Sequence, residues 1–442
     1  MQPISQSSKN SEMSYLTRGF KQKLLQGQSA TWSKGDRTLF RILFFIPLVN
    51  AAADCTIYYF VDITAGGMHP GIIRGLLLLA FILLFGLRRL LKTPVSVMIF
   101  VFLFYLLILT VFSSRTVYSF TNGYIKWFVS LAMFPVGYYF FRSYDHVVRL
   151  IFFLVIGASF VCINLLIAQF IGYGISAYVE DTFYLGGAGV GITNQLAYVL
   201  LTYPILLRFK DRFSALEKWF IYIIGLLSIA FVIISMKRAG IVGLAVGSLI
   251  YFGFTRNKGK VLKYTFLAVA FIVITLPFYS DILQKRYNER VAQIENYEQE
   301  GRYREFFYVI QEFQEGNIWQ KMFGNEIFNT GQFFGIKYFS RERMIHGDIS
   351  SMFYGSGLFG IMMYFWIFIL IFIKGVAYFR KVRNDKYLRE LMASYFSMLF
   401  AVIFVSAAGS GTIGEKCLVF LYLGAISGLM AHIVPVIKSN QT

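Results

Sequence analysis

The sequence predicts an all-α polytopic membrane protein of about twelve transmembrane helices, with one large external (periplasmic) loop between the ninth and tenth. Three observations predict this fold class. Of the 442 residues, 57% are hydrophobic and only 15% are charged, whereas soluble domains carry roughly 25% charged residues. The hydrophobic residues are gathered into long segments. The basic residues are concentrated in every second connection between those segments.

Twelve segments come close to the length of about 20 mostly apolar residues that a transmembrane helix needs. They are long apolar runs without the strict alternation of a barrel strand, so helices are expected. The predicted spans are 38–61, 71–87, 95–113, 124–141, 148–172, 190–207, 218–236, 239–254, 262–279, 351–373, 390–408 and 414–437. Outside the two blocks of spans, 38–279 and 351–437, lie a basic N-terminal segment, 1–37, an external helical loop, 280–350, and a short tail, 438–442.

The basic residues predict the orientation of these spans. Lys and Arg accumulate in short cytoplasmic connections. One set of alternate connections holds Lys9 to Arg37, Arg88, Arg89, Lys92, Arg142, Arg149, Arg208, Lys210, Arg212, Lys218, Arg256, Lys258, Lys260, Lys263, Lys374 to Arg389 and Lys438. We therefore expect both termini in the cytoplasm and the loop 280–350 outside.

Charge and motif content exclude several classes of function. The net charge of +19 is accounted for by cytoplasmic loops beside anionic lipid, and no nucleic-acid-binding motif is present. The three cysteines show neither a disulfide framework nor metal-ligand spacing. The sequence also lacks the GxxxxGK[ST] phosphate-binding loop of ATP-driven proteins. We therefore expect neither a metal nor a cofactor nor a nucleic-acid partner.

Lys237 and Arg238 lie at the predicted outer end of the seventh span, in the segment "ISMKRAGIVGLAVG". A charge at the edge of the membrane is costly and needs a reason. One interpretation is an interfacial cation that extends toward water. The other is an anion clamp, because a guanidinium presents a planar fork of donors that fits phosphate.

His346 precedes the tenth span, in "RERMIHGDISSMFYGSGLFGIMM", and is one of four histidines. An imidazole can take or give a proton near neutral pH. Asp348, two residues later, is close enough in sequence to orient the imidazole or to bind a sugar hydroxyl. A structural role for a lone histidine at the membrane edge is the alternative.

Arg302 and Arg304 flank an aromatic residue in the long external loop. They are either a solvated helix face paired with nearby glutamates, among them Glu305, or part of a basic pocket for a pyrophosphate-linked substrate.

Several short motifs together resemble the O-antigen ligase and polymerase superfamily. They are "SMKRAGIVGLAV", the large loop with "RYREFFYVIQEF" and "MFGNEIFNT", and then "HGDISSMFYGSGLFGI". Upstream, "GGAGVGITNQLAYVL" is similar to the family's asparagine-containing entry to a span and marks Asn194. The resemblance covers about 185–375 by motif and the whole chain by topology.

The resemblance implies an enzyme of the bacterial inner membrane that transfers a glycan from undecaprenyl pyrophosphate to an acceptor hydroxyl, without metal or ATP. Carried over, it gives Arg238 and His346 the leading roles and Arg302 a weaker one. The expected partners are the lipid-linked oligosaccharide, membrane lipid, and the chain-length regulator and flippase of the same pathway.

Three departures from the family pattern favour a repeat-unit polymerase over a ligase. No Arg or Lys occurs in 173–193, the turn reads "MFGNEIF", and Gly-Asp rather than Asn follows His346. The polymerase would serve O-antigen, capsule or exopolysaccharide synthesis. The alternatives are a ligase that moves finished chains onto lipid A core and, in another class, a flippase for the lipid-linked repeat.

Overall fold

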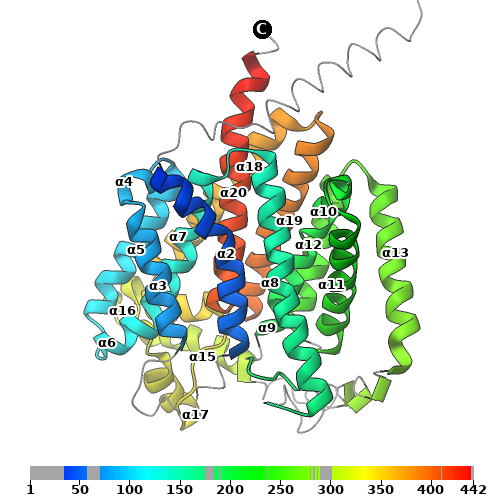
Figure 1. Ribbon diagram of the computed structural model, residues 1–442. Helices are drawn as coiled ribbons and strands as arrows, with labels where there is room; N and C mark the ends of the chain where they lie inside the picture. The colour runs from blue at the N-terminus through cyan, green and yellow to red at the C-terminus, as the bar shows by residue number, and fades with distance from the viewer. Residues whose placement is uncertain are drawn as a thin grey trace, which may run out of the picture.

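The computed structural model describes residues 34–56, 70–174, 184–188, 191–235, 237–278, 280–281, 284–285, 287–288, 301–409 and 411–439. Within these residues the chain is almost entirely helical (Figure 1). None of them forms a β-strand; a single isolated bridge joins Gly174 and Gly186. The predicted all-α architecture is therefore confirmed.

Every predicted span corresponds to helical structure. The helices are α2 (Lys34–Thr56), α3 (Pro70–Leu84), α5 (Pro94–Val111), α7 (Ile125–Phe140), α8 (Tyr144–Ile171), α9 (Ile192–Leu200) with α10 (Tyr203–Arg208), α11 (Ala215–Ile234), α12 (Arg238–Phe254), α13 (Lys258–Thr275), α18 (Asp348–Val382), α19 (Lys386–Ala408) and α20 (Ile413–Ser439). The sixth predicted span is interrupted near Pro204, since proline supplies no backbone N–H to a continuing helix.

Among the described residues, seven helices are long and apolar enough to cross a membrane: α2, α5, α8, α11, α18, α19 and α20. Shorter apolar helical stretches cover Ile73–Leu84, Arg238–Phe254 and Val261–Ile274. The membrane character of the chain is thus supported. The count of twelve spans stays a prediction.

Local sequence sets several helix boundaries. The Thr93 side chain accepts from the Ser96 N–H at the start of α5, and Ser214 forms a capping box with Glu217 at the start of α11. These side chains satisfy backbone donors that the first helical turn leaves unpaired. Helix α8 ends at Gly172, whose φ of 65° suits a residue without a Cβ.

Helix α20 is the centre of the bundle, and 89% of its apolar span is buried (Figure 1). It packs most extensively against α7, where Gly424 and Gly428 meet the backbone carbonyls of Phe134 and Tyr138. A Cβ at either glycine would collide with backbone, so small residues permit this close approach. Helix α13, in contrast, stands at the edge of the bundle.

The segment between α13 and α18 covers one end of the bundle (Figure 1). It contains α15 (Gly301–Glu315), α16 (Ile318–Phe323), the π-turn η8 (Gly331–Gly335) and α17 (Ile336–Phe339). We call this end the loop end. Helix α2 finishes near it, while α12, α18 and α20 begin there. At the opposite end, Arg212 of η5 (Lys210–Arg212) pairs with Asp145 of α8.

The loop is attached to α18 by a small apolar cluster of its own. Val309, Phe334, Ile345 and Tyr354 are buried together. The ring of Phe313 in α15 also lies 4.9 Å from that of Phe353 in α18. This cluster fixes the backbone directly before His346 against the membrane-spanning bundle.

Candidate functional site

His346 is held by a buried glutamate of the loop. Its Nδ1 lies 2.8 Å from Oε1 of Glu305, and its backbone N–H donates to Oε2 at 3.0 Å. Glu305 is 2% exposed, whereas 47% of the His346 side chain is exposed. The imidazole is therefore fixed on one side and open to solvent on the other.

Arg343 completes this cluster. Its Nε donates to Glu305 Oε1 at 2.8 Å, and its guanidinium lies over the ring of Phe339 at 4.7 Å. Burial acts to raise the pKa of Glu305, but the hydrogen bonds from the His346 ring and backbone and from Arg343 outweigh it. The pKa of Glu305 consequently lies below its ordinary value.

A low pKa keeps Glu305 an acceptor-only carboxylate. Nδ1 of His346 must then carry the hydrogen in the 2.8 Å contact, which leaves Nε2 as the basic nitrogen. Nε2 has no hydrogen-bond partner within the part of the chain that the structure describes. An imidazole whose tautomer is fixed by a carboxylate can act as a general base.

The sequence suggests that Asp348 could orient His346. In the structure Glu305 occupies that role instead. Asp348 is buried, and its carboxylate accepts hydrogen bonds from Lys416 Nζ at 2.8 Å and from the Gly411 N–H at 3.4 Å. Its own N–H donates to the Gly409 carbonyl at 3.3 Å. It therefore ties the start of α18 to the turn between α19 and α20. Binding of a sugar hydroxyl by Asp348 stays a prediction.

Arg304 lies between aromatic rings. Its guanidinium is 5.5 Å from the ring centroid of Tyr308 and 5.6 Å from that of Phe339, and it donates to the Tyr308 hydroxyl at 2.9 Å. Its sequence neighbour Glu305 forms hydrogen bonds with Arg343 and His346. Arg302 belongs to α15, but its side chain lies outside the described residues, so its predicted role is not tested.

Lys237 and Arg238 begin α12 at the loop end. A Cβ placed on Gly191 would lie 3.5 Å from Lys237 Nζ and 3.3 Å from Glu415 Oε1. The lysine and the glutamate are thus neighbours at the starts of α12 and α20. Asn194, also predicted as a site residue, donates to Glu415 Oε2 at 3.4 Å.

The group formed by Lys237, Asn194 and Glu415 contains buried polar atoms without a hydrogen-bond partner among the described residues. Glu415 and Asn194 are each 1% exposed. Glu415 Oε1 and Asn194 Oδ1 are buried and make no hydrogen bond with any described residue. Buried acceptors are usually satisfied because an unpaired one is costly. Such atoms at the loop end point to a place where a ligand or water is bound.

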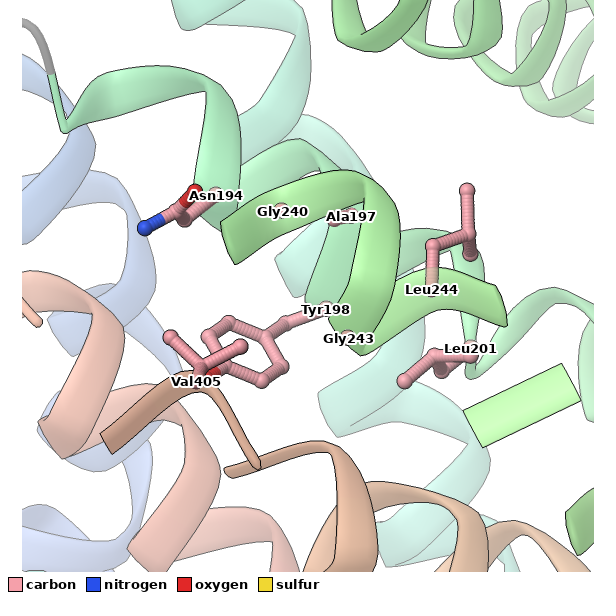
Figure 2. Close-up of a pocket in the computed structure, with 8 residues that line it drawn as sticks. All are labelled: Asn194, Ala197, Tyr198, Leu201, Gly240, Gly243, Leu244 and Val405. Atoms are coloured by element: carbon pink, nitrogen blue, oxygen red, sulfur yellow. The ribbon is translucent and has the colours of Figure 1, made fainter. Parts of the chain in front are cut away.

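A crevice runs from Asn194 between α9, α12 and α19 (Figure 2). Tyr198, Leu201, Leu244 and Val405 line its apolar part. Asn194 lies at its polar end, where Oδ1 is 2.8 Å from the position that a Cβ on Gly240 would take. A glycine at that position is therefore needed for α12 to pass so close to α9.

Gly409, at the end of α19, lies beside both predicted centres. Gly409 accepts from the Asp348 N–H, and a Cβ on Gly409 would lie 3.8 Å from the Cβ of Ala239. Asp348 is two residues from His346, and Ala239 is adjacent to Arg238. The starts of α12 and α18, which carry the two leading candidates, thus meet at Gly409.

Sequence reasoning missed the role of several charged residues. The sequence indicates for Glu305 only a salt bridge on a helix face. Arg74 pairs with Asp54 inside the bundle, and Gln195 donates to the same carboxylate. A charged residue inside an apolar segment was the available signal for Asp54 and Arg74. Nothing in the local sequence indicated which residue would meet His346.

No protein-family model matches the chain, and no curated protein matches its sequence. The described residues also include no group of three or more His, Cys, Asp or Glu side chains able to hold a metal ion. The resemblance to the O-antigen ligase and polymerase superfamily therefore depends on the short motifs alone.

Proposed function

We propose that the chain is a membrane glycosyltransferase that polymerises undecaprenyl-pyrophosphate-linked oligosaccharide repeats for O-antigen, capsule or exopolysaccharide. The observation that carries this proposal is the exposed imidazole of His346, fixed by the buried Glu305. It lies at the end of the bundle where Lys237 and Arg238 begin α12. A positioned base and a cationic group are what transfer from a pyrophosphate leaving group requires.

In the proposed reaction, an acceptor sugar hydroxyl gives its proton to Nε2 of His346 while its oxygen attacks the anomeric carbon of the donor glycan. The bond from that carbon to the pyrophosphate oxygen breaks, and undecaprenyl pyrophosphate leaves with the electron pair. Arg238 and Lys237 neutralise the charge that develops on the pyrophosphate. The proton then passes from His346 to solvent. The donor is already activated, so ATP is not consumed.

The charge distribution supports an external location for this chemistry. Basic side chains are numerous at the opposite end, where Arg212 pairs with Asp145 and Arg389 donates to the Phe254 carbonyl at 2.9 Å. On the basis of the positive-inside rule, we propose that this end faces the cytoplasm. The proposal therefore includes the bacterial inner membrane, cytoplasmic termini, and a flippase and a chain-length regulator as pathway partners.

The lipid-linked glycan profile of a deletion strain complemented with variants tests this function. We expect His346→Ala and Arg238→Ala to remain in the membrane at normal amounts and to accumulate single lipid-linked repeats. The matched controls are His432→Ala and Arg383→Ala, since both residues lie toward the opposite end of the bundle.

Other outcomes would indicate the alternatives. Long chains retained on undecaprenyl pyrophosphate would indicate a ligase. Single repeats trapped on the cytoplasmic side of the membrane would indicate a flippase. Normal long glycan in both the His346 and Arg238 variants would reject the site.

A further inference from the structure

The carboxylate of Glu415 lies close below the surface of the loop end. A Cβ placed on Gly191 would lie 3.3 Å from Glu415 Oε1, and a Cβ placed on Gly411 would lie 3.1 Å from Oε2. The N–H of Thr412 donates to Oε2 at 3.2 Å. Gly191, Gly411 and Thr412 are all partly exposed. Glycine at two of these three positions leaves the carboxylate without a covering side chain there.

Two buried oxygens of this group lack a donor. Glu415 Oε1 and Asn194 Oδ1 belong to residues that are each 1% exposed, and neither atom makes a hydrogen bond with a described residue. The remaining polar atoms of the two side chains meet each other, because Asn194 Nδ2 donates to Glu415 Oε2 at 3.4 Å. A ligand that satisfies both unpaired oxygens must therefore supply hydrogen-bond donors.

This requirement selects the chemistry of the ligand. The oxygens of a pyrophosphate diester carry no hydrogen, so they only accept hydrogen bonds, and a carboxylate repels them. A sugar suits the two oxygens, since each of its hydroxyls can donate as well as accept. The two parts of a lipid-linked glycan thus have different partners at the loop end: cations suit the pyrophosphate, and the unpaired oxygens of Glu415 and Asn194 suit the sugar.

Lys237 is near enough to Glu415 for one ligand to contact both. A single point, the Cβ position on Gly191, lies 3.5 Å from Lys237 Nζ and 3.3 Å from Glu415 Oε1. In a lipid-linked glycan the first sugar is joined directly to the pyrophosphate, so its hydroxyls lie next to the phosphate oxygens. A cation and a hydrogen-bond acceptor on either side of one point match this order of groups.

The two acceptors are held in place from the interior of the bundle. Gln195, next to Asn194, donates to the buried carboxylate of Asp54. Gly414, next to Glu415, packs against this contact, because a Cβ there would lie 2.6 Å from Gln195 Nε2. The starts of α9 and α20 are thereby fixed relative to each other. The two oxygens are consequently in position before a ligand binds, which lowers the cost of binding.

We propose that Glu415 and Asn194 form a sugar-binding subsite, which recognises hydroxyl groups of the sugar attached to the pyrophosphate of the donor. This rests on the proposed function. In that reaction the anomeric carbon of this sugar is the atom attacked, so binding its hydroxyls selects the substrate and also orients the reacting carbon. Glu415 and Asn194 are accordingly specificity-determining residues.

Binding of two kinds of lipid to the purified full chain in nanodiscs tests the subsite. The probes are bare undecaprenyl pyrophosphate and undecaprenyl pyrophosphate that carries one glucose, galactose or N-acetylglucosamine. We expect the wild type to bind at least one glycosylated lipid about tenfold more tightly than the bare lipid, as expected for hydrogen bonds to a charged group.

Two variants locate this preference. In Glu415→Gln the amide carbonyl keeps the Thr412 N–H, so an NH₂ group replaces Oε1 and offers the sugar a donor instead of an acceptor. The preference should then be lost, while the affinity for the bare lipid stays equal or increases, because a negative charge beside Lys237 is gone. Asn194→Ala should also lose most of the preference. A general loss of structure would weaken both lipids.

Glu390→Gln is the matched control and should keep the preference, because it changes a buried glutamate that several donors already satisfy. Equal binding of glycosylated and bare lipids by the wild type would overturn the subsite and assign the unpaired oxygens to ordered water. An unchanged preference in both site variants, or an equal loss of both lipids, would also overturn it.

The same measurement reports on the proposed function separately. Arg238→Ala should weaken both lipids alike, since its guanidinium acts on the pyrophosphate that they share. A wild type that binds both lipids equally leaves the proposed function intact, whereas one that binds neither overturns the function and the subsite together.

Discussion

Two buried glutamates in consecutive helices, Glu390 of α19 and Glu415 of α20, have opposite environments. Glu390 accepts from the Tyr251 hydroxyl at 2.5 Å, the Thr255 hydroxyl at 2.7 Å and the Asn257 amide at 2.9 Å. The Arg256 N–H adds a fourth donor at 3.3 Å. Glu415 has an oxygen with no partner among the described residues, as does the Asn194 beside it.

The difference separates a structural site from a candidate binding site. The donors around Glu390 all belong to the end of α12 and the residues that follow it, so the carboxylate fastens α12 to α19 at the opposite end. At the loop end the polar groups are as deeply buried but incompletely paired. Buried polar groups without partners are costly, which is consistent with a region that is completed by substrate.

The largest effect should come from Glu390→Ala. It removes an acceptor shared by four donors and leaves them unpaired, with a cost of about 4 kcal/mol in the free energy of unfolding. Thermal unfolding in detergent should show a markedly lower midpoint. Glu390→Gln, which retains an acceptor oxygen, should lose less. An unchanged midpoint for the alanine variant would contradict the structural role of Glu390.

Glu305→Gln should have the next largest effect, on turnover. An amide cannot hold His346 in one tautomer as a carboxylate does, so we expect transfer to fall about 100-fold, which equals ~2.7 kcal/mol in the barrier. The kcat for a soluble acceptor should fall while KM changes little. Rescue by Glu305→Asp would support positioning. A loss confined to KM would indicate a binding role instead.

Glu415→Gln should affect function more than stability. Because Oε1 already lacks a partner, we expect less than about 1 kcal/mol of change in the free energy of unfolding. Long glycan should nevertheless decrease in the complemented strain. If this variant were as unstable as Glu390→Ala, the contrast between the two glutamates would be lost.

The smallest effect is a local response to acid. The pKa of Glu305 is lower in the folded chain, so its stabilising contribution is fully present above its ordinary value of about 4.3 and is lost as the pH falls through the depressed value. Hydrogen exchange of residues 343–347 should therefore increase below about pH 4. The same segment of Glu305→Gln should show no such step.

The sequence alone determined the helical membrane architecture, because long apolar segments have few other stable forms. All the predicted spans are helical, and Asn194, Lys237, Arg238 and His346 lie at or near helix starts. The pairing of their side chains was not predictable, since it joins residues far apart in sequence. His346 is 41 positions from Glu305, and Asn194 is 221 positions from Glu415.

Tertiary structure therefore decided what the charged residues do. Asp348 is nearer to His346 in sequence, but the start of a helix directs it toward Lys416, while the apolar cluster around Ile345 brings Glu305 to the imidazole. Close packing of α7 against α20 places Trp127 beside Lys416. Apolar patterning fixes which segments are helices. Only the packing of those helices determines which charges meet, because each such contact depends on the positions of two distant segments.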